Sequence, residues 1–556
     1  MIQSIETHST NKVVMIGWDG ATFDVLGPMM DAGVMPALVR FMEQAACGVL
    51  RTTRPPVTCP AWPTMFTGVN PGKHGVFSFS YRDPSNGRMR TASGPDVRAP
   101  KIWEILCDAG RRVAVLNVPI TFPAAVSHGV MLSGFVSPDD STKVLCPESW
   151  NADLRSQFDP LHLNWDVLSH RPADPRLREA HIERINEYLA LRNRQFEYLL
   201  DRCEADFCFL VHEYTDRVQH LFYHLLDPRF DGYHASENRR AVSLLKDGFA
   251  ELDRSLQRLL DRFGDEANYM IVSDHGFGGV NQWVYVNNLL EQNGLLKLKQ
   301  GKVWADALTR RFGVSDRVRS RLGLHPREPW HRQDPWRAPL IDYANTVAFA
   351  GPQLEHSVYI NVRGRGPQGI VETGVEYDRV REQVVELLEA AKDPVTGAKV
   401  FEGVWPREEL YDGPLADGAP DIIYELAPGY MVPNYPLPTR MMRGRFLRGL
   451  RPGWDLSGYH RPEGVLIAKG PGVLGGARCD ASIVDIAPTV LYLMDLPVPN
   501  YMDGAVIDSL VRPELLAARA PSACDRECLS TIPAGAAYTT DEQALVTRRL
   551  EELGYL

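Results

Sequence analysis

The chain has 556 residues, of which 44% are hydrophobic and 23% are charged, so it is long enough for one large α/β domain with insertions or for several ordinary domains. Its formal net charge of −10 is the opposite of the basic surface that nucleic-acid polymers require. Residues 1–20 lack a secretory-signal pattern, and no apolar run approaches the ~18 residues of a spanning helix. We therefore expect a cytoplasmic protein with neither a membrane nor a nucleic-acid polymer as partner, and its nine cysteines, without CxxC spacing, fit reduced thiols.

Short β-branched runs alternate with helical patterns along the chain. Runs that stop at polar or glycine-rich residues predict buried strands within residues 12–20, 112–119, 206–216, 269–279 and 464–472. Helical spacing of apolar residues covers residues 177–201 and 239–263. This alternation predicts an α/β fold in which a mainly parallel sheet is sandwiched by helices.

One long region interrupts the alternation. Residues 296–455 contain a charged stretch and a proline-rich stretch, and we interpret them as an insertion or cap. The core is then formed by residues 1–295 and 456–510, and residues 511–556 form a tail with one terminal helix.

Polar residues follow the predicted strands where each strand ends. They are three aspartates and three histidines: Asp19, Asp216, His220, Asp274, His275 and His460. In open sheets of this kind ligands bind outside the carboxyl ends of the strands. Each residue alone also fits a turn, a cap or a solvated helix face, but their common place at one sheet edge favours a metal site. Carboxylates and imidazoles suit zinc, with manganese or iron as alternatives, and six ligands suffice for two divalent ions with three protein ligands each.

The order of the motifs resembles a known family. "IGWDG", "TCPAWPTMFTGVNPGKHGV", "DRVQH", "SDHGF", "GYHRPEG" and "DIAPTVLYLMDLPVPNYMDG" follow one another within residues 13–504. Together they resemble the alkaline phosphatase superfamily and, within it, the type I phosphodiesterase and nucleotide pyrophosphatase branch. The resemblance implies an alkaline-phosphatase-like fold and a two-metal hydrolase that acts on small phosphate esters or nucleotides.

The resemblance also implies roles for individual residues. One metal would be held by Asp19, Asp274 and His275 and would contact the nucleophile Thr58, which lies in the "VTCPAW" segment. The second metal would be held by Asp216, His220 and His460. The implied reaction forms a covalent phospho-threonine intermediate on Thr58. The neighbouring Cys59 is a weaker candidate because a hard phosphoryl centre favours oxygen over sulfur.

The segment around Thr58 departs from the branch pattern. The family nucleophile is followed by "FPNH", where this chain has "CPAW", and Phe79 stands where the family has a phosphate-contacting Asn. Trp62 is expected to pack rather than to contact substrate. Other residues must then hold the phosphate, and the candidates are Asn117, Lys101 and Arg363.

Several alternatives share this metal site. A phosphomonoesterase, a phosphonate hydrolase or a phosphomutase needs the same ligands, and ligands alone do not separate them. A sulfatase is disfavoured because it needs a "C/S-x-P-x-R" sequence, where this chain has Thr58 and Trp62 at the first and last positions. A metal-binding scaffold without catalysis is the alternative from another class.

Overall fold

The computed structural model describes residues 11–552 except 83–88, 164–174, 235, 237, 325–337, 339, 352–354, 367, 434–444, 451–455 and 529–536. Its centre is a nine-stranded sheet. In spatial order the strands are β19 (Ala481–Ser482), β2 (Ala46–Arg51), β18 (Glu463–Lys469), β9 (Asn268–Val272), β1 (Val13–Trp18), β8 (Phe207–His212), β5 (Val113–Val118), β6 (Gly129–Ser133) and β7 (Leu145–Cys146). The five strands from β9 to β6 pair in parallel, while β18 and β7 join antiparallel. The predicted mainly parallel sheet is confirmed.

Alternation along β1 explains why both faces of the sheet need helices. Its six residues are all buried, and Val14, Ile16 and Trp18 enter one apolar cluster while Val13 and Met15 enter another. A strand buried on both faces carries a continuous apolar run, which is the pattern that predicted it.

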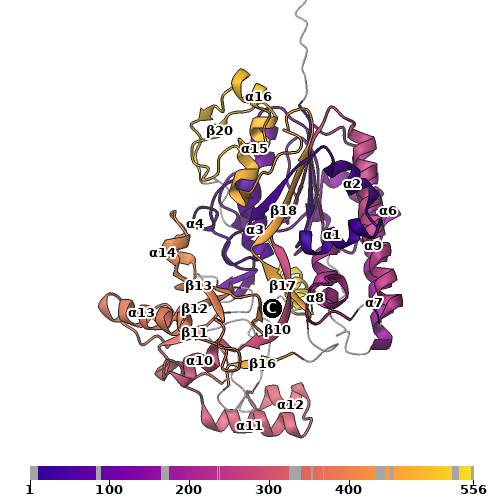
Figure 1. Ribbon diagram of the computed structural model, residues 1–556. Coiled ribbons are helices and arrows are strands. Elements are labelled where there is room, and N and C mark those ends of the chain that lie inside the picture. Colours follow the sequence, from indigo (N-terminus) through magenta and orange to yellow (C-terminus); the bar gives the residue numbers. More distant parts are fainter. Residues whose placement is uncertain are drawn as a thin grey trace, which may run out of the picture.

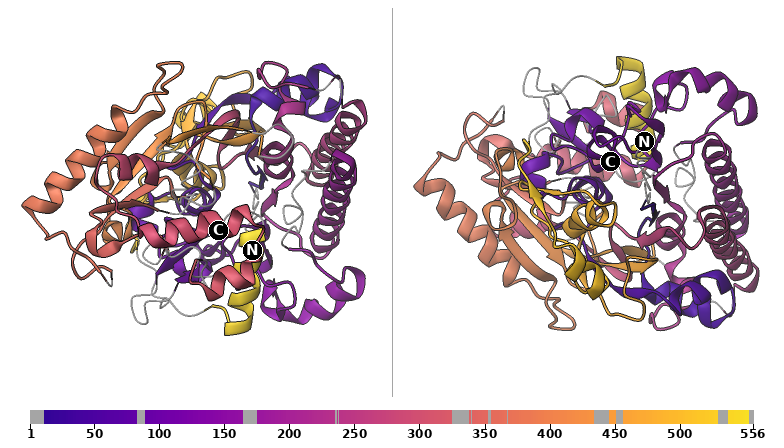
Figure 2. Two further views of the ribbon diagram at one scale, coloured as in Figure 1. Left: turned by 90° about the horizontal axis from the view of Figure 1, so that it is seen from below. Right: turned by 90° about the horizontal axis from the view of Figure 1, so that it is seen from above.

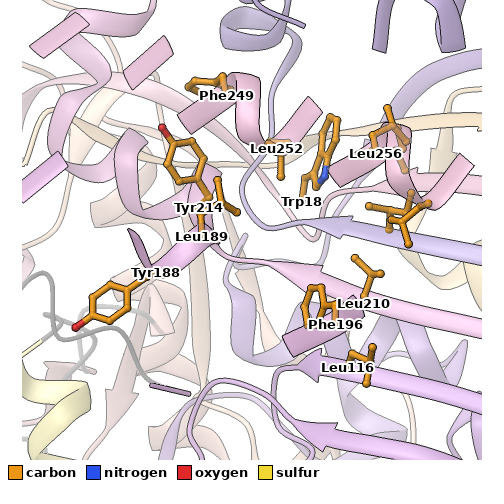
Figure 3. Close-up of a cluster of buried hydrophobic side chains, with 14 of the residues drawn as sticks. Trp18, Leu116, Tyr188, Leu189, Phe196, Leu210, Tyr214, Phe249, Leu252 and Leu256 are labelled. Carbon is orange, nitrogen blue, oxygen red and sulfur yellow. The ribbon is translucent and has the colours of Figure 1, made fainter. Parts of the chain in front are cut away.

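Helices cover both faces of this sheet. The first apolar cluster is closed by α1 (Phe23–Asp31), α2 (Pro36–Met42), α7 (Pro175–Leu200), α8 (Tyr214–Leu226) and α9 (Arg239–Phe263). Figure 3 shows part of this cluster, with Trp18 and Leu210 from the sheet and Phe249, Leu252 and Leu256 from α9. The second cluster is closed by α3 (Thr58–Thr67), α5 (Ile102–Asp108), α15 (Ile486–Leu493) and α17 (Thr540–Glu552). In Figure 1 the long helices α7 and α9 lie on the right of the sheet, and α3 and α15 on its left.

A second body of sheet lies below the carboxyl ends of the parallel strands (Figure 1). One small sheet centres on β10 (Gly276–Val284), which pairs with β15 (Gly429–Met431), β16 (Leu447–Gly449) and β17 (Gly458–Arg461). The other contains β11 (Ala348–Ala350), β12 (Ser357–Ile360), β14 (Ile422–Leu426) and β13 (Phe401–Pro406). Together with α10 (Val286–Gln292) and α13 (Val375–Glu389) they build one apolar cluster that runs from Val280 to Tyr459. We call this body the cap; the boundaries expected at 296 and 455 stay a prediction.

All nine cysteines are free thiols. Within the described residues no single helix is long and apolar enough to cross a membrane, although α1 and α2 together pass as a bent pair on length and composition alone.

Candidate active site

The six predicted ligands and Thr58 meet at one point, between the carboxyl ends of the parallel strands and the cap. Asp19 follows β1, Asp216 and His220 lie on the first turns of α8, Asp274 and His275 join β9 to β10, and His460 lies on β17. None of these residues is more than 5% exposed, and Thr58 is 2% exposed. The structure therefore brings all six predicted residues together, although His460 lies within β17 of the cap and not after a strand of the central sheet. The roles of these residues stay predictions.

Adjacent strands bring the first carboxylates together. Because β1 and β9 pair in parallel, with Gly17 opposite Val272, both strands end at the same level. The amide of Gly20 then donates to Asp274 Oδ1 over 3.1 Å, which ties the two strand ends.

The strands that lead into and out of the cap bring two histidines together. β10 and β17 pair antiparallel, with Phe277 opposite His460 and Gly276 opposite Arg461. This register lays the imidazole of His460 against that of His275, with ring centroids 3.8 Å apart and planes 24° apart. Residues 185 positions apart in the chain thus become neighbours through one short ladder.

Backbone carbonyls set the tautomer of all three histidines. The Nδ1 atoms of His220, His275 and His460 lie 3.3, 3.1 and 3.1 Å from the carbonyl oxygens of Gly458, Gly276 and Pro56. A carbonyl can only accept, so we assign the proton to Nδ1 and a lone pair to each Nε2. The Nε2 atoms of His220 and His460 are 3.0 Å apart, so two acceptors face each other. A cation between the two Nε2 atoms would satisfy both lone pairs. A metal-bound histidine usually donates its other ring N–H, here Nδ1–H, to a carbonyl of this kind.

The carboxylates complete two groups of converging ligand atoms. One group is Asp19, Asp274 and His275, and the other is Asp216, His275 and His460; within each group the ligand atoms lie within 4.8 Å of one another. His220 adds to the second group, because its Nε2 is 3.3 Å from Asp216 Oδ1. The partition of ligands between two ions stays a prediction.

Two of these carboxylate oxygens are buried without a hydrogen-bond partner in the described part of the chain. They are Asp19 Oδ1 and Asp274 Oδ2, which lie 3.6 and 3.3 Å from His275 Nε2. Buried polar atoms are normally paired. Unsatisfied oxygens beside an imidazole lone pair therefore fit a divalent cation, and the residues present can hold one.

The electrostatics of the cluster are unbalanced without such a cation. Burial, together with the neighbouring carboxylates of Asp274 and Asp216, raises the pKa of Asp19 well above its ordinary value. Burial also raises the pKa of Asp274 and lowers that of His275 to about 4. The positive charge of a divalent ion would lower the pKa of these carboxylates and so stabilise their ionised form.

Thr58 is presented by the start of α3. Val57 is extended, and Thr58 is the first helical residue. Pro60 is tolerated in the first turn because a proline there gives up an N–H that has no acceptor within the helix. The hydroxyl Oγ1 of Thr58 lies 3.1 Å from His275 Nε2. Thr58 thus contacts the cluster directly.

The neighbouring Cys59 faces a different environment. It is fully buried in the apolar cluster that includes Met65 and Phe66. Burial, and then the charges of Asp96 and Glu355, raises the pKa of its thiol well above the ordinary value. A thiol that stays protonated is a poor nucleophile.

Trp62 has a role that sequence reasoning missed. It packs in the core as expected, with its ring centroid 5.8 Å from that of Phe209 and no exposed surface. Its indole Nε1–H also donates to Asp19 Oδ2 over 3.1 Å. Because this bond occupies Oδ2, the free Oδ1 is the oxygen that faces the cluster. Phe79, by contrast, is only core, edge-on to Phe135 at 5.7 Å.

Other supporting residues were also missed. The guanidinium of Arg217 is fully buried, 3.3 Å from Asp216 Oδ2 and 4.8 Å above the ring centroid of Phe135. On the cap side the ring of Tyr459 stacks on His460 at 5.4 Å, and its hydroxyl lies 2.8 Å from His356 Nε2. The arginine in "DRVQH" and the tyrosine in "GYH" stand beside predicted ligands, and this adjacency is the one signal that could have identified them.

The three candidate phosphate contacts have other partners. Asn117 is fully buried at φ 61° and donates to the carbonyl of Val211 over 2.9 Å. Lys101 precedes α5 and pairs with Glu104 at 3.1 Å. Arg363 lies in the cap, 61% exposed, and pairs with Glu372 at 2.6 Å. Among the described residues the structure does not bring these three side chains into hydrogen bonds with the cluster, and their roles stay predictions.

Comparison with known proteins fits this geometry. A model of the type I phosphodiesterase / nucleotide pyrophosphatase family matches residues 13–446. The chain belongs to this family. The family inferred from the motif order is thereby confirmed, and membership supports a hydrolase of phosphoric esters.

Solved structures with a similar fold are distant in sequence. Phosphonoacetate hydrolase from Sinorhizobium meliloti 1021, in complex with phosphonoformate, is 19% identical over 87% of this chain and 95% of that chain, with a TM-score of 0.49. Murine ectonucleotide pyrophosphatase / phosphodiesterase 5 is 13% identical over 90% of this chain and 100% of that chain, with a TM-score of 0.47. A comparison with curated proteins gave no match. At this distance the solved structures do not bear on the activity.

Proposed function

We propose that this phosphodiesterase-family chain hydrolyses phosphodiester or pyrophosphate bonds of small molecules, with Thr58 as the nucleophile. The observation that carries the proposal is the contact between Thr58 Oγ1 and His275 Nε2, 3.1 Å, inside a buried cluster of three carboxylates and three imidazoles. A threonine hydroxyl that only starts a helix has no need of a buried group of carboxylates and imidazoles beside it.

The proposed reaction assigns two sets of metal ligands and one nucleophile. Asp19, Asp274 and His275 would hold one divalent ion beside Thr58, and Asp216, His220 and His460 a second. When bound, zinc or a similar ion supplies the positive charge that makes a hydroxyl nucleophilic and stabilises a departing oxygen. We expect Thr58 Oγ1 to lose its proton to solvent and to form a bond to phosphorus while the bond from phosphorus to the leaving oxygen breaks. The leaving oxygen takes up a proton from solvent. Water then cleaves the phospho-threonine.

The start of α3 supports this reaction. The first N–H groups of a helix have no acceptor within it, and they lend the N-terminus a partial positive charge. Thr58 is the first residue of the ten-residue α3, so a phosphoryl group at its hydroxyl would lie at this terminus. Such contacts stand in for the phosphate-contacting Asn that the family has where this chain has Phe79.

The test is turnover of paired chromogenic phosphate diester and monoester substrates after metal loading. Thr58→Ala should lose at least about 1,000-fold in kcat, as expected when a nucleophile is removed, while Thr58→Ser keeps the hydroxyl and should retain measurable activity. Mass spectrometry of acid-quenched enzyme should find phosphate on the peptide that contains Thr58. Turnover by Thr58→Ala at the wild-type rate would refute the covalent mechanism. Hydrolysis of the monoester alone would favour the monoesterase alternative.

A further inference from the structure

A helical hairpin of the cap exposes an unusual amount of apolar surface. It consists of α11 (Gln300–Arg311), α12 (Asp316–Arg321) and the turn between them. Large hydrophobic residues that are exposed in the described residues concentrate here: Trp304 at 53%, Leu308 at 51%, Phe312 at 71%, Val318 at 43% and Leu322 at 55%. Scattered single exposures are ordinary on a protein surface, but a gathered set marks an interaction surface.

Helical spacing places these residues in stripes. Trp304, Leu308 and Phe312 are four residues apart, and the amide of Phe312 donates to the carbonyl of Leu308 over 3.1 Å, which continues the helical geometry. Val318 and Leu322 repeat the spacing on α12, again with a 3.1 Å bond between them. Residues four apart lie on one face of a helix. Each helix therefore carries its own apolar stripe.

The opposite side of the hairpin is already packed. Val303 is buried in the apolar cluster of the cap, and Leu324 is 2% exposed. Asp306 and Arg319 form a buried ion pair that joins α11 to α12. The exposed stripes thus lie away from these buried contacts, which fix the hairpin in place.

The hairpin is also basic in an acidic protein. Taken with the residues that flank it, the hairpin spans residues 297–324, which contain eight lysines and arginines and two aspartates. The net charge of this segment is +6, so the rest of the chain carries −16, which together give the total of −10. One of the two aspartates, Asp306, is neutralised within the buried ion pair. Lys297, Lys299, Arg311 and Arg321 are exposed. In Figure 1 the hairpin lies at the lower end of the cap, away from the central sheet, and in the view from below (Figure 2, left) its helices lie in front.

We propose that this hairpin docks on the surface of an anionic lipid bilayer. Exposed Trp, Phe and Leu beside basic residues are the composition of helices that lie in the headgroup region. An anionic surface attracts the +6 hairpin and repels the −16 remainder, so only the cap end can approach it. A nucleic acid would match the charge but leave Phe312 and Leu308 without a role. This proposal goes beyond the proposed hydrolysis and replaces the expectation of no membrane partner, which rested on spanning helices alone.

The experiment is co-sedimentation of the full chain with vesicles. Phosphatidylcholine vesicles are compared with vesicles in which part of the lipid is phosphatidylglycerol, at low and high salt. We expect binding to the anionic vesicles only, and weaker binding at high salt because the charges are screened. No binding to anionic vesicles, or equal binding to both kinds, would overturn the proposal.

Variants separate the two contributions. Leu308→Ser with Phe312→Ser should weaken the partition coefficient at least about tenfold, because that apolar area no longer leaves water. Lys297→Gln with Lys299→Gln should cost about fivefold for each charge. The control is Val375→Ser with Val395→Ser, which removes two cap residues that are 87% and 89% exposed outside the hairpin and should leave binding unchanged.

Three further measurements test whether the variants fold and whether the surface serves another partner: substrate turnover, competition with duplex DNA, and light scattering. Turnover of a soluble substrate should be the same in the hairpin variants and the wild type, which shows that they fold. Undiminished vesicle binding by Leu308→Ser with Phe312→Ser sinks the proposal. Displacement of the protein from vesicles by duplex DNA would also overturn the proposal, because the surface would then bind nucleic acid. The same holds if the protein does not bind vesicles but forms a dimer in light scattering that Leu308→Ser with Phe312→Ser abolishes, because the surface would then bind a second copy of the chain.

Discussion

Trp62→Phe tests whether the indole of Trp62 positions a metal ligand. In the structure Trp62 Nε1–H donates to Asp19 Oδ2 over 3.1 Å, and Asp19 Oδ1 is left 3.6 Å from His275 Nε2. Phenylalanine keeps an aromatic ring in the core but has no donor. The carboxylate of Asp19 then loses the bond that fixes which oxygen faces the cluster.

The magnitude follows from the charge of the acceptor. A hydrogen bond to a charged group contributes about 1.5–3 kcal/mol, and about 1.4 kcal/mol corresponds to a factor of ten. The ion that we propose for Asp19, Asp274 and His275 should therefore bind about 10- to 100-fold more weakly, which is the usual effect of losing a hydrogen-bond partner of a ligand. The other ion should bind as in the wild type, because Trp62 has no hydrogen bond to Asp216 or His460 in the described residues.

The assay is competition for zinc between metal-free protein and a chelating dye. Trp103→Phe is the matched control: Trp103 is 1% exposed, packs at 4.7 Å on Phe66 in the same apolar cluster, and loses the same atoms away from the metal ligands. Thermal melting of both variants measures the shared packing cost. If Trp62→Phe and Trp103→Phe bind zinc equally well, the positioning argument is wrong.

Two further predictions concern charge. Asp216→Asn should lower the metal content of the loaded protein from about two ions per chain to about one, measured by elemental analysis; unchanged stoichiometry would contradict the ligand assignment. Burial raises the pKa of the Glu355 carboxyl from its ordinary value to about 7, against hydroxyl donation from Tyr359, Ser78 and Ser357. Folding thus favours the protonated carboxyl, and this stabilisation is complete below the unfolded pKa and is lost as pH rises through about 7. Between pH 6 and 8 the wild type should lose about 1 kcal/mol of unfolding free energy relative to Glu355→Gln, measured by denaturant titration, and parallel losses would refute the assignment.

The central sheet and the convergence of polar residues at its edge could be predicted for the same reason. Strands buried on both faces leave a continuous apolar signal, and parallel strands end at one edge, so the polar residues after β1 and β9 had to meet. His460 is different, because its place beside His275 depends on one ladder between β10 and β17 that closes across the whole cap. The sequence placed His460 at a strand end, whereas the structure places it within β17 of the cap, so the reason for its position could not be read from the sequence.

The supporting contacts could not be predicted because they depend on side-chain direction. Nothing in "CPAWP" says that the indole of Trp62 reaches Asp19, and a buried Arg217 looks like a surface residue in the sequence. The basic stretch of the cap was visible in the sequence, but its apolar stripes were not, since exposure is a property of the fold.

The connection between cap and core explains how the cap can vary without moving the residues of the buried cluster. The chain leaves the core at Gly276, next to His275, and returns through β17, which carries His460. Shifting this ladder by one residue would place His460 on the other face of its strand and dismantle the cluster. The rest of the cap is free to vary in length and surface, because such changes do not alter the register of the four residue pairs between β10 and β17. The proposed docking surface, and any substrate contacts that the cap makes, can therefore change while the proposed metal ligands stay in place.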